Sequence, residues 1–148
     1  MKQEDLASEY GVSTRHERMP NGELRFRLIG PDGSAYVRTV AGEGGAWQNS
    51  HFHLEVRETY VVERGWMGYV VLAPRTGTPK WRVLRKGAIV TTPVRLPHNV
   101  YLPAGAVIHT VKHSGQVDVP DWHAATELDS MTKHIDEAEL LRLAAGAK

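Results

Sequence analysis

The 148-residue chain contains no cysteine. Disulfides, thiolate nucleophiles and sulfur ligands to a metal are therefore excluded, and any metal ion must be bound by histidine, aspartate or glutamate. The eight histidines consequently become the residues of greatest interest.

The chain also lacks a long apolar run and a strong charge of one sign. No stretch approaches the ~20 apolar residues that span a bilayer, and acidic side chains stand near the N-terminus, where a signal peptide needs an apolar core. The formal net charge is +1, with acids and bases mixed along the chain, so the sequence has no basic footprint for nucleic acid. We therefore expect a cytoplasmic protein that binds neither nucleic acid nor a membrane.

Apolar residues make up 41% of the chain and charged residues 24%, which is typical of a soluble globular protein. The length favours a single domain over residues 1–148. Its core is expected at about residues 35–113, preceded by N-terminal strands within residues 14–29. The C-terminal segment, residues 115–148, has a different character.

Short apolar or alternating segments follow one another at near-regular spacing. Asn21-Gly22 favours a tight hairpin turn between two of them, and residues 23–29 alternate apolar with charged side chains, as in a half-buried strand. A last hairpin is expected about residues 103–105. The predicted strands are residues 14–19, 23–29, 35–40, 65–72, 81–84, 88–92, 98–102 and 107–113. This pattern predicts an all-β sandwich or barrel, and a double-sheet jelly roll satisfies it.

The C-terminal segment contains two further signals. Residues 120–123 are expected to pack across the outside of the barrel. Asp136 and Glu139 are spaced as the N-cap and N3 residues of a capping box, so a short helix with an apolar side is predicted after Asp136.

Two histidines and a glutamate stand close together near the middle of the sequence. His51 and His53 are two residues apart, so on an extended strand their imidazoles project from one face. Glu58 would face the other way on a straight strand, so we expect a bend over residues 54–57 that brings the three side chains together. Two imidazoles and a carboxylate then form a site for a first-row divalent metal. The alternative is an exposed histidine pair on a polar strand face.

Glycines flank this group in a pattern that resembles the cupin family. The first cupin motif is glycine, five residues, His-x-His, four residues, glutamate, six residues, glycine. It is matched at Gly45, His51, His53, Glu58 and Gly65.

A second segment resembles the other cupin motif, which is glycine, five residues, Pro-x-Gly, two residues, histidine. Gly87, Pro93 and His98 match it. Arg95 stands where the motif has its second glycine, and Leu102 stands where an asparagine is expected.

The resemblance covers residues 45–102 and implies a double-stranded β-helix, the jelly-roll barrel of the cupins. It also implies a metal held by His51, His53, Glu58 and His98. The ion would be a divalent transition metal, Fe, Mn, Ni or Zn, and iron is favoured because four hard ligands without a thiolate suit it. Such a ligand set leaves two positions of an octahedral metal open.

His109 competes with His98 for the place of third imidazole. It follows a second Pro-x-Gly sequence, at Pro103 and Gly105, but three residues rather than two separate it from the glycine. We therefore expect His98 to be the ligand. The strand parity that His109 shares with Val107 places it either inside the barrel as a candidate catalytic residue or in the core, hydrogen-bonded to a neighbour.

Other residues are candidates for contact with a substrate. Arg95, beside the barrel mouth, is either a bidentate clamp for a carboxylate or phosphate or an ordinary exposed loop arginine. Its presence suggests that the turn does not need a positive φ, or that a ligand contact has replaced a backbone one. The remaining candidates are Gln48 and Tyr69 for substrate binding, Tyr60 for catalysis, and Trp47 as a cavity wall; Trp47 and Tyr69 equally suit a plain core.

Three classes of function fit these features. The first is a metal-dependent enzyme acting on a small organic molecule, with a dioxygenase-like oxidoreductase favoured. The second is a sugar isomerase or epimerase, which the resemblance implies would either use the metal for proton transfer or dispense with it and use a His–Tyr pair, with His109 and Tyr60 or Tyr69 as the candidates. The third is a non-catalytic cupin that binds a small ligand, although a complete metal ligand set weighs against it. A homodimer is expected in any case, formed through the N-terminal strands or the region of Trp122.

Overall fold

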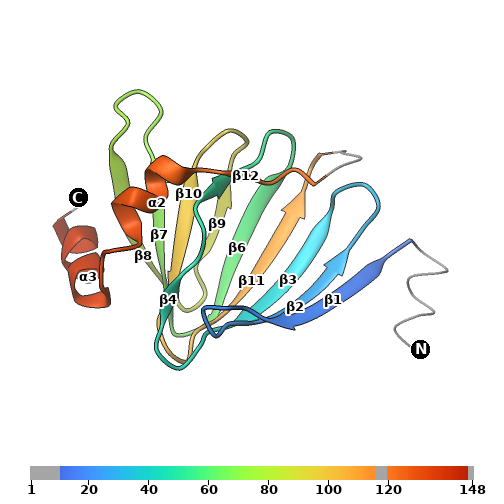
Figure 1. Ribbon diagram of the computed structural model, residues 1–148, viewed down its shortest axis with the longest axis horizontal. Coiled ribbons are helices and arrows are strands. Elements are labelled where there is room, and N and C mark those ends of the chain that lie inside the picture. Colours follow the sequence, from blue (N-terminus) through green and yellow to red (C-terminus); the bar gives the residue numbers. More distant parts are fainter. Residues whose placement is uncertain (1–10, 116–119, 147–148) are drawn as a thin grey trace.

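The computed structural model describes residues 11–115 and 120–146. Within these ranges the strands form two antiparallel sheets of six strands each, packed as a sandwich (Figure 1). The first sheet has the order β1 (Ser13–Arg18), β2 (Leu24–Ile29), β3 (Ala35–Val40), β11 (Val107–His113), β6 (Arg57–Arg64) and β9 (Ile89–Thr92). The second has the order β12 (His123–Ala124), β5 (His51–Phe52), β10 (His98–Leu102), β7 (Trp66–Leu72) and β8 (Pro79–Arg85), with β4 (Ala46–Trp47) paired to β10.

The predicted all-β jelly roll is confirmed, and so is the hairpin about Asn21-Gly22, which joins β1 to β2. The expected hairpin about residues 103–105 is wrong. β10 pairs with β7, β5 and β4, whereas β11 pairs with β3 and β6 in the other sheet. The turn therefore crosses between the sheets, because both strands already have partners on each edge.

The C-terminal segment contributes more structure than the sequence predicted. The expected helix is α3 (Glu137–Gly146), and the Glu139 N–H donates to the Asp136 side chain at 2.9 Å, as the capping pattern predicted. A second helix, α2 (Thr126–Thr132), was not predicted. Figure 1 shows both helices (orange to red) at the β7–β8 end of the sandwich, with β1 at the opposite end. None of the helices in the described residues is long and apolar enough to cross a membrane.

In β2 the apolar side chains face outward and the charged ones face inward, which is the reverse of the usual arrangement in an amphipathic strand. Phe26 and Leu28 are 40% and 41% exposed on the outer face of the sheet. The charged residues of the alternation, Arg25 and Arg27, line a cavity between the sheets, and Glu23 is fully buried. Alternation alone shows that a strand has two different sides, but the composition of the cavity decides which side faces inward.

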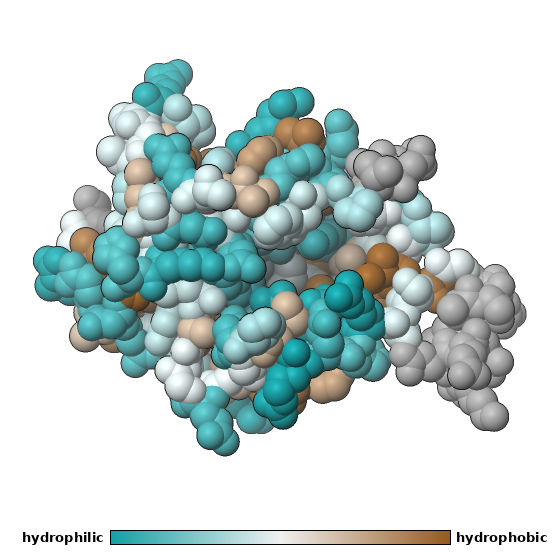
Figure 2. Space-filling view, in the orientation of Figure 1, coloured by the Kyte–Doolittle hydropathy of each residue, from teal (hydrophilic) through white to brown (hydrophobic). Residues whose placement is uncertain are grey.

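Apolar packing is concentrated at one end of the sandwich. The buried cluster includes Val62, Met67, Leu84, Leu102 and Ile108. At the other end of β6 and β11, the inward positions carry polar side chains and line the cavity. Figure 2 shows hydrophilic side chains over most of one face and a few apolar ones beside its hollow. The fold thus provides a rigid apolar base and an open polar end.

Candidate metal centre

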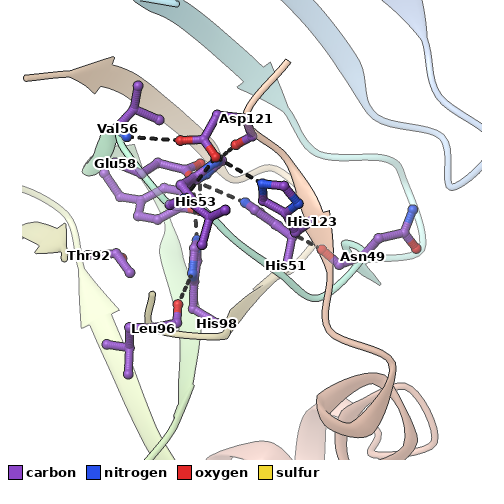
Figure 3. Close-up of polar contacts among 12 residues, drawn as sticks. Asn49, His51, His53, Val56, Glu58, Thr92, Leu96, His98, Asp121 and His123 are labelled. Atoms are coloured by element: carbon purple, nitrogen blue, oxygen red, sulfur yellow. Dashed lines mark hydrogen bonds and ion pairs between the residues drawn. The ribbon is translucent and has the colours of Figure 1, made fainter. Parts of the chain in front are cut away.

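Three imidazoles and one carboxylate converge at the polar end of the sandwich (Figure 3). They belong to His51 on β5, His53 just beyond it, Glu58 on β6 and His98 on β10, and their potential ligand atoms all lie within 4.8 Å of one another. All four side chains are buried; His98 is fully buried and Glu58 is 4% exposed. The predicted bend lies just before β6, which begins at Arg57, and it brings Glu58 onto the same point as the histidines.

The outer nitrogen of each imidazole contacts a backbone carbonyl. Nδ1 of His51 lies 3.0 Å from the Asn49 oxygen, and Nδ1 of His98 lies 2.9 Å from the Leu96 oxygen. Nδ1 of His53 contacts the Asp121 carbonyl. A carbonyl only accepts, so each Nδ1 must carry the proton, and each neutral ring then directs the lone pair of Nε2 toward the centre.

The inner nitrogens all surround one oxygen of Glu58. Nε2 of His51 and Nε2 of His98 lie 3.1 and 3.2 Å from Glu58 Oε2, and Nε2 of His53 also contacts it. Three lone pairs facing a carboxylate oxygen repel one another unless a cation lies among them. Protons can play that part, but the donor set of three imidazoles and one carboxylate is equally the one that a divalent first-row metal prefers. The residues therefore fit such a metal.

Tyr60 holds the second oxygen of Glu58. Its hydroxyl donates to Oε1 at 2.8 Å, leaving Oε2 as the oxygen directed at the histidines. Burial raises the pKa of the Tyr60 phenol well above its usual value, and the Glu58 charge adds to this effect. Burial also opposes ionisation of Glu58, but hydrogen bonds from the three imidazoles, when a proton at Nε2 takes the place of a metal, outweigh it and hold the Glu58 pKa well below its usual range. Glu58 is thus ionised and Tyr60 protonated at neutral pH.

Burial acts differently on His51. It lowers the pKa of the His51 imidazole, and the neighbouring Glu58 carboxylate offsets only part of this effect. His51 therefore resists protonation, which favours the neutral form that a metal requires.

Residues 120–122 of the C-terminal segment, called the strap below, fix the bend between His53 and Glu58. The Asp121 carboxylate accepts hydrogen bonds from the backbone N–H groups of Leu54 (2.8 Å), Glu55 (2.7 Å) and Val56 (3.0 Å). Burial by itself would raise the Asp121 pKa. The hydrogen bonds from these N–H groups outweigh that effect, and the net pKa is lowered to about 2. Residues 120–123 were expected on the outside of the barrel. Instead, Pro120, Asp121 and Trp122 line the cavity, and the strap continues into β12.

Replacing Asp121 with asparagine is expected to destabilise the protein by about 1–3 kcal/mol. The three backbone N–H groups of the bend now donate to two charged oxygens, whereas an amide would offer them a single neutral acceptor oxygen. The Asp121 pKa is depressed, so this contribution is present above the ordinary value of 3.8 and is lost as the pH falls through about 2. Urea unfolding at neutral pH measures the loss. Asp32→Asn, at an exposed turn whose carboxylate accepts from Ser34, is the matched control and should change stability little. Equal losses in both variants would contradict a special role for the strap.

His109 does not lie inside the barrel. The residues of β11 that face the cavity are Thr110 and Lys112, so His109 projects from the outer face. There its Nδ1 lies 2.6 Å from the Tyr36 hydroxyl, and its Nε2 lies 3.1 Å from Glu63 Oε1. Val107 and His109 do share a side of β11, but it is the side opposite to Ile108, Thr110 and Lys112, which face the core and the cavity. The expectation that this parity places His109 inside the barrel is therefore wrong. Tyr60 faces inward, so the two residues lie on opposite sides of the sheet and cannot act as a pair.

The turn of the second motif keeps a glycine-like backbone without a glycine. Arg95 has φ 65°, so the suggestion that this turn needs no positive φ is wrong. Its N–H donates to the His53 carbonyl at 2.6 Å, which ties the turn to a residue of the candidate site. The Arg95 side chain is exposed and is not among the residues that line the cavity. Gly45 and Gly65 also have positive φ, 71° and 73°.

Arg95→Gly is expected to stabilise the protein by about 1 kcal/mol, since the left-handed conformation costs a residue with a Cβ roughly that much. Arg95→Ala removes the same guanidinium but keeps the Cβ, so it should give no such gain. The denaturant midpoint at unchanged m-value measures both effects. Equal stabilisation in the two variants would show that charge, rather than φ, is responsible.

The other residues that were predicted to contact a substrate or line the cavity differ in where their side chains lie. Gln48 lines the cavity, where its Nε2 donates to Glu23 at 3.2 Å. Tyr69 is a core residue, 3% exposed, with its hydroxyl 2.6 Å from the Thr92 hydroxyl. The Trp47 indole donates to the Ile135 carbonyl at 2.8 Å and packs against Trp81, so it anchors the C-terminal segment.

Sequence reasoning missed three residues near the centre. Asp121 and Trp122 lie 63 or more residues beyond Glu58 in the chain, and no motif connects them to it. Trp122 stacks on the His51 ring at a centroid distance of 5.5 Å. Lys112 pairs directly across from Glu58, but this is visible only once the register of β11 and β6 is known. The strand parity of residues 107–113 was the only available signal, and parity alone does not show which side of the strand faces the cavity.

The cavity beside the centre has a volume of about 540 Å³. This is within the range of about 300–1,000 Å³ that holds small organic ligands. Glu58 and His51 contribute to its wall, so a ligand in the cavity would touch the metal-binding residues directly.

Comparisons with known proteins identify similar structures but no similar sequence. No protein-family model matches the chain, and no curated protein matches it significantly. Oxalate decarboxylase from Bacillus subtilis is similar in structure, with a TM-score of 0.61 and 17% identity over 88% of this chain. This chain spans 37% of the length of that enzyme. Drosophila melanogaster CENP-C, in a structure bound to CAL1, is similar over 68% of this chain and 76% of its own, with a TM-score of 0.54 and 12% identity.

Proposed function

We propose that this chain, which has the cupin fold, is a metal-dependent enzyme that acts on a small organic molecule. The observation that carries the proposal is the convergence of three imidazole Nε2 atoms on Glu58 Oε2 at the wall of a ligand-sized cavity. His51, His53, Glu58 and His98 would hold the metal, and a divalent metal there would supply Lewis acidity or one-electron redox chemistry.

The surrounding residues prepare this site for a substrate. Tyr60 and the carbonyls of Asn49, Leu96 and Asp121 orient the ligand side chains, so little rearrangement accompanies metal binding. Trp122 stacks on His51 at the cavity wall and shields that side of the site from water. A preorganised, partly dry site with ligand access supports catalysis better than simple metal storage.

For the reaction we propose a dioxygenase-like oxidation of a small organic substrate by O₂. The hard nitrogen and oxygen ligands suit iron, and the cavity offers room for an organic substrate next to them. The alternative metal is manganese, since one structure of the B. subtilis decarboxylase, 16% identical to this chain, is described by its Mn(II) centres. A sugar isomerase that uses His109 with a tyrosine has no support, because His109 projects from the outer face.

Elemental analysis of the purified protein, followed by oxygen uptake with candidate substrates, tests this function. About one iron per chain with substrate-dependent oxygen uptake would support the dioxygenase. Manganese with release of CO₂ and no oxygen consumption would replace it with a decarboxylase. Absence of any transition metal, even after incubation with Fe(II) or Mn(II), would contradict a metal-dependent enzyme of either kind.

We also propose that the chain forms a homodimer. Phe26, Leu28 and Val111 are at least 36% exposed and lie on the outer face of the first sheet, where Tyr36 connects Leu28 to Val111 across the strands. Exposed apolar side chains in a continuous row favour association. Light scattering that shows only monomer at micromolar concentration would contradict the dimer.

A further inference from the structure

The cavity beside the candidate metal centre is lined by both basic and apolar side chains. The apolar lining includes Ile29, Val37, Val56 and Trp122. The basic lining residues are Arg15, Arg25, Arg27 and Lys112. What distinguishes these basic residues from one another is whether each already has an acidic partner.

The three arginines have partners. Arg25 forms an ion pair with the fully buried Glu23 at 2.8 Å. Arg27 and Arg15 both contact Glu17, at 2.8 and 3.3 Å. These pairs hold the guanidinium groups against the wall of the cavity and reduce their effect on a ligand.

Lys112 is different. Among residues 11–115 and 120–146, its ammonium has no ion-pair or side-chain hydrogen-bond partner. It stands on β11 directly across from Glu58, and directly opposite neighbours on one face of a sheet are about 5 Å apart at Cβ. Glu58 is not free to pair with it, because Tyr60 and the three imidazoles occupy both carboxylate oxygens. The charge of Lys112 is therefore available to a ligand in the cavity.

The charge balance of the cavity also favours an anionic ligand. The four basic lining residues are matched by four acids, namely the lining residues Glu58 and Asp121 and the arginine partners Glu17 and Glu23. Asp121 is engaged by backbone N–H groups of the bend. A bound divalent metal then leaves an excess of positive charge in a partly buried cavity, which an anionic ligand would neutralise.

We propose that the substrate is an organic carboxylate, held by the Lys112 ammonium with its carboxylate next to the metal. Its apolar body lies against Val37, Val56 and Trp122, where the exposed indole offers a flat surface. A cavity of about 540 Å³ accommodates an aromatic or medium-chain aliphatic acid. This inference rests on the proposed function and assigns the anion-binding role to Lys112 rather than to the exposed Arg95.

The test compares a carboxylate with its neutral amide on metal-loaded protein. Isothermal titration calorimetry with 3-phenylpropionate and 3-phenylpropionamide should show that the acid binds at least about tenfold more tightly, since a charge-assisted contact is lost in the amide. Lys112→Met should weaken binding of the acid by about tenfold or more and leave binding of the amide unchanged. Lys86→Met, on an exposed turn away from the cavity, is the matched control and should alter neither.

The metal content of each variant separates this inference from the proposed function. Lys112→Met should retain the wild-type metal content and thermal stability, so a loss of affinity for the acid would be specific. Wild-type protein that binds metal but shows equal affinity for acid and amide, or no binding of the acid at millimolar concentration, would overturn the role of Lys112. Wild-type protein that binds no metal would instead contradict the proposed function.

Discussion

Replacing His98 with alanine is expected to abolish tight binding of a divalent transition metal. His98 is fully buried on β10, and its Nε2 is one of three that meet at Glu58 Oε2. Loss of an outer hydrogen-bonding partner of a metal ligand typically lowers affinity by about 10–100-fold, so loss of a ligand itself should exceed this. Metal content after dialysis, and competition with a chelator of known affinity, measure the effect.

The matched control is His109→Ala. His109 was the other candidate for the third imidazole, but it lies on the outer face between Tyr36 and Glu63. Its loss should leave metal affinity unchanged. If His109→Ala released the metal while His98→Ala retained it, the ligand assignment would be wrong. Circular dichroism of both variants excludes unfolding as the cause of any loss.

Acid is expected to release the metal cooperatively below neutral pH. An imidazole binds metal only when it is neutral, and its unperturbed pKa is about 6.5. Burial lowers the pKa of His51, which moves its protonation to lower pH, and a bound cation would move it further. Glu58 keeps its charge throughout this range because its pKa is well below the usual value. Metal affinity should therefore fall with decreasing pH as up to three protons compete for the imidazoles.

Two variants separate the contributions to this pH dependence. Glu58→Gln should weaken binding at all pH values because a negative charge is lost, yet keep the dependence on the histidines. Replacing one imidazole, as in His98→Ala, should reduce the number of competing protons by about one in whatever binding remains. Affinity is measured by chelator competition at a series of pH values. A metal content that stays constant from about pH 8 to about pH 4 would rule out a site made of three imidazoles.

The sequence determined the strands and the spacing of the candidate ligands. Turn residues such as Asn21-Gly22 act locally, so strand positions could be predicted without knowing their partners. The His-x-His pair and Glu58 are close in sequence, so one short bend between them is enough to bring the three side chains together. His98 followed from its count of residues after Gly87. The capping residues of α3 are likewise local, and its start was predicted correctly.

Only the tertiary structure decided which side of each strand faces inward and which distant segments meet at the site. Phe26 and Leu28 lie outside because the sheets enclose a charged cavity, in which buried ion pairs such as Glu23–Arg25 replace apolar packing. The regular alternation of β11 places Lys112 inward and His109 outward, but only the assembled sheets show which side of the strand faces the cavity. Asp121 reached the bend across more than 60 residues of chain. Register and long-range docking depend on the summed packing of two whole sheets, which no local pattern contains.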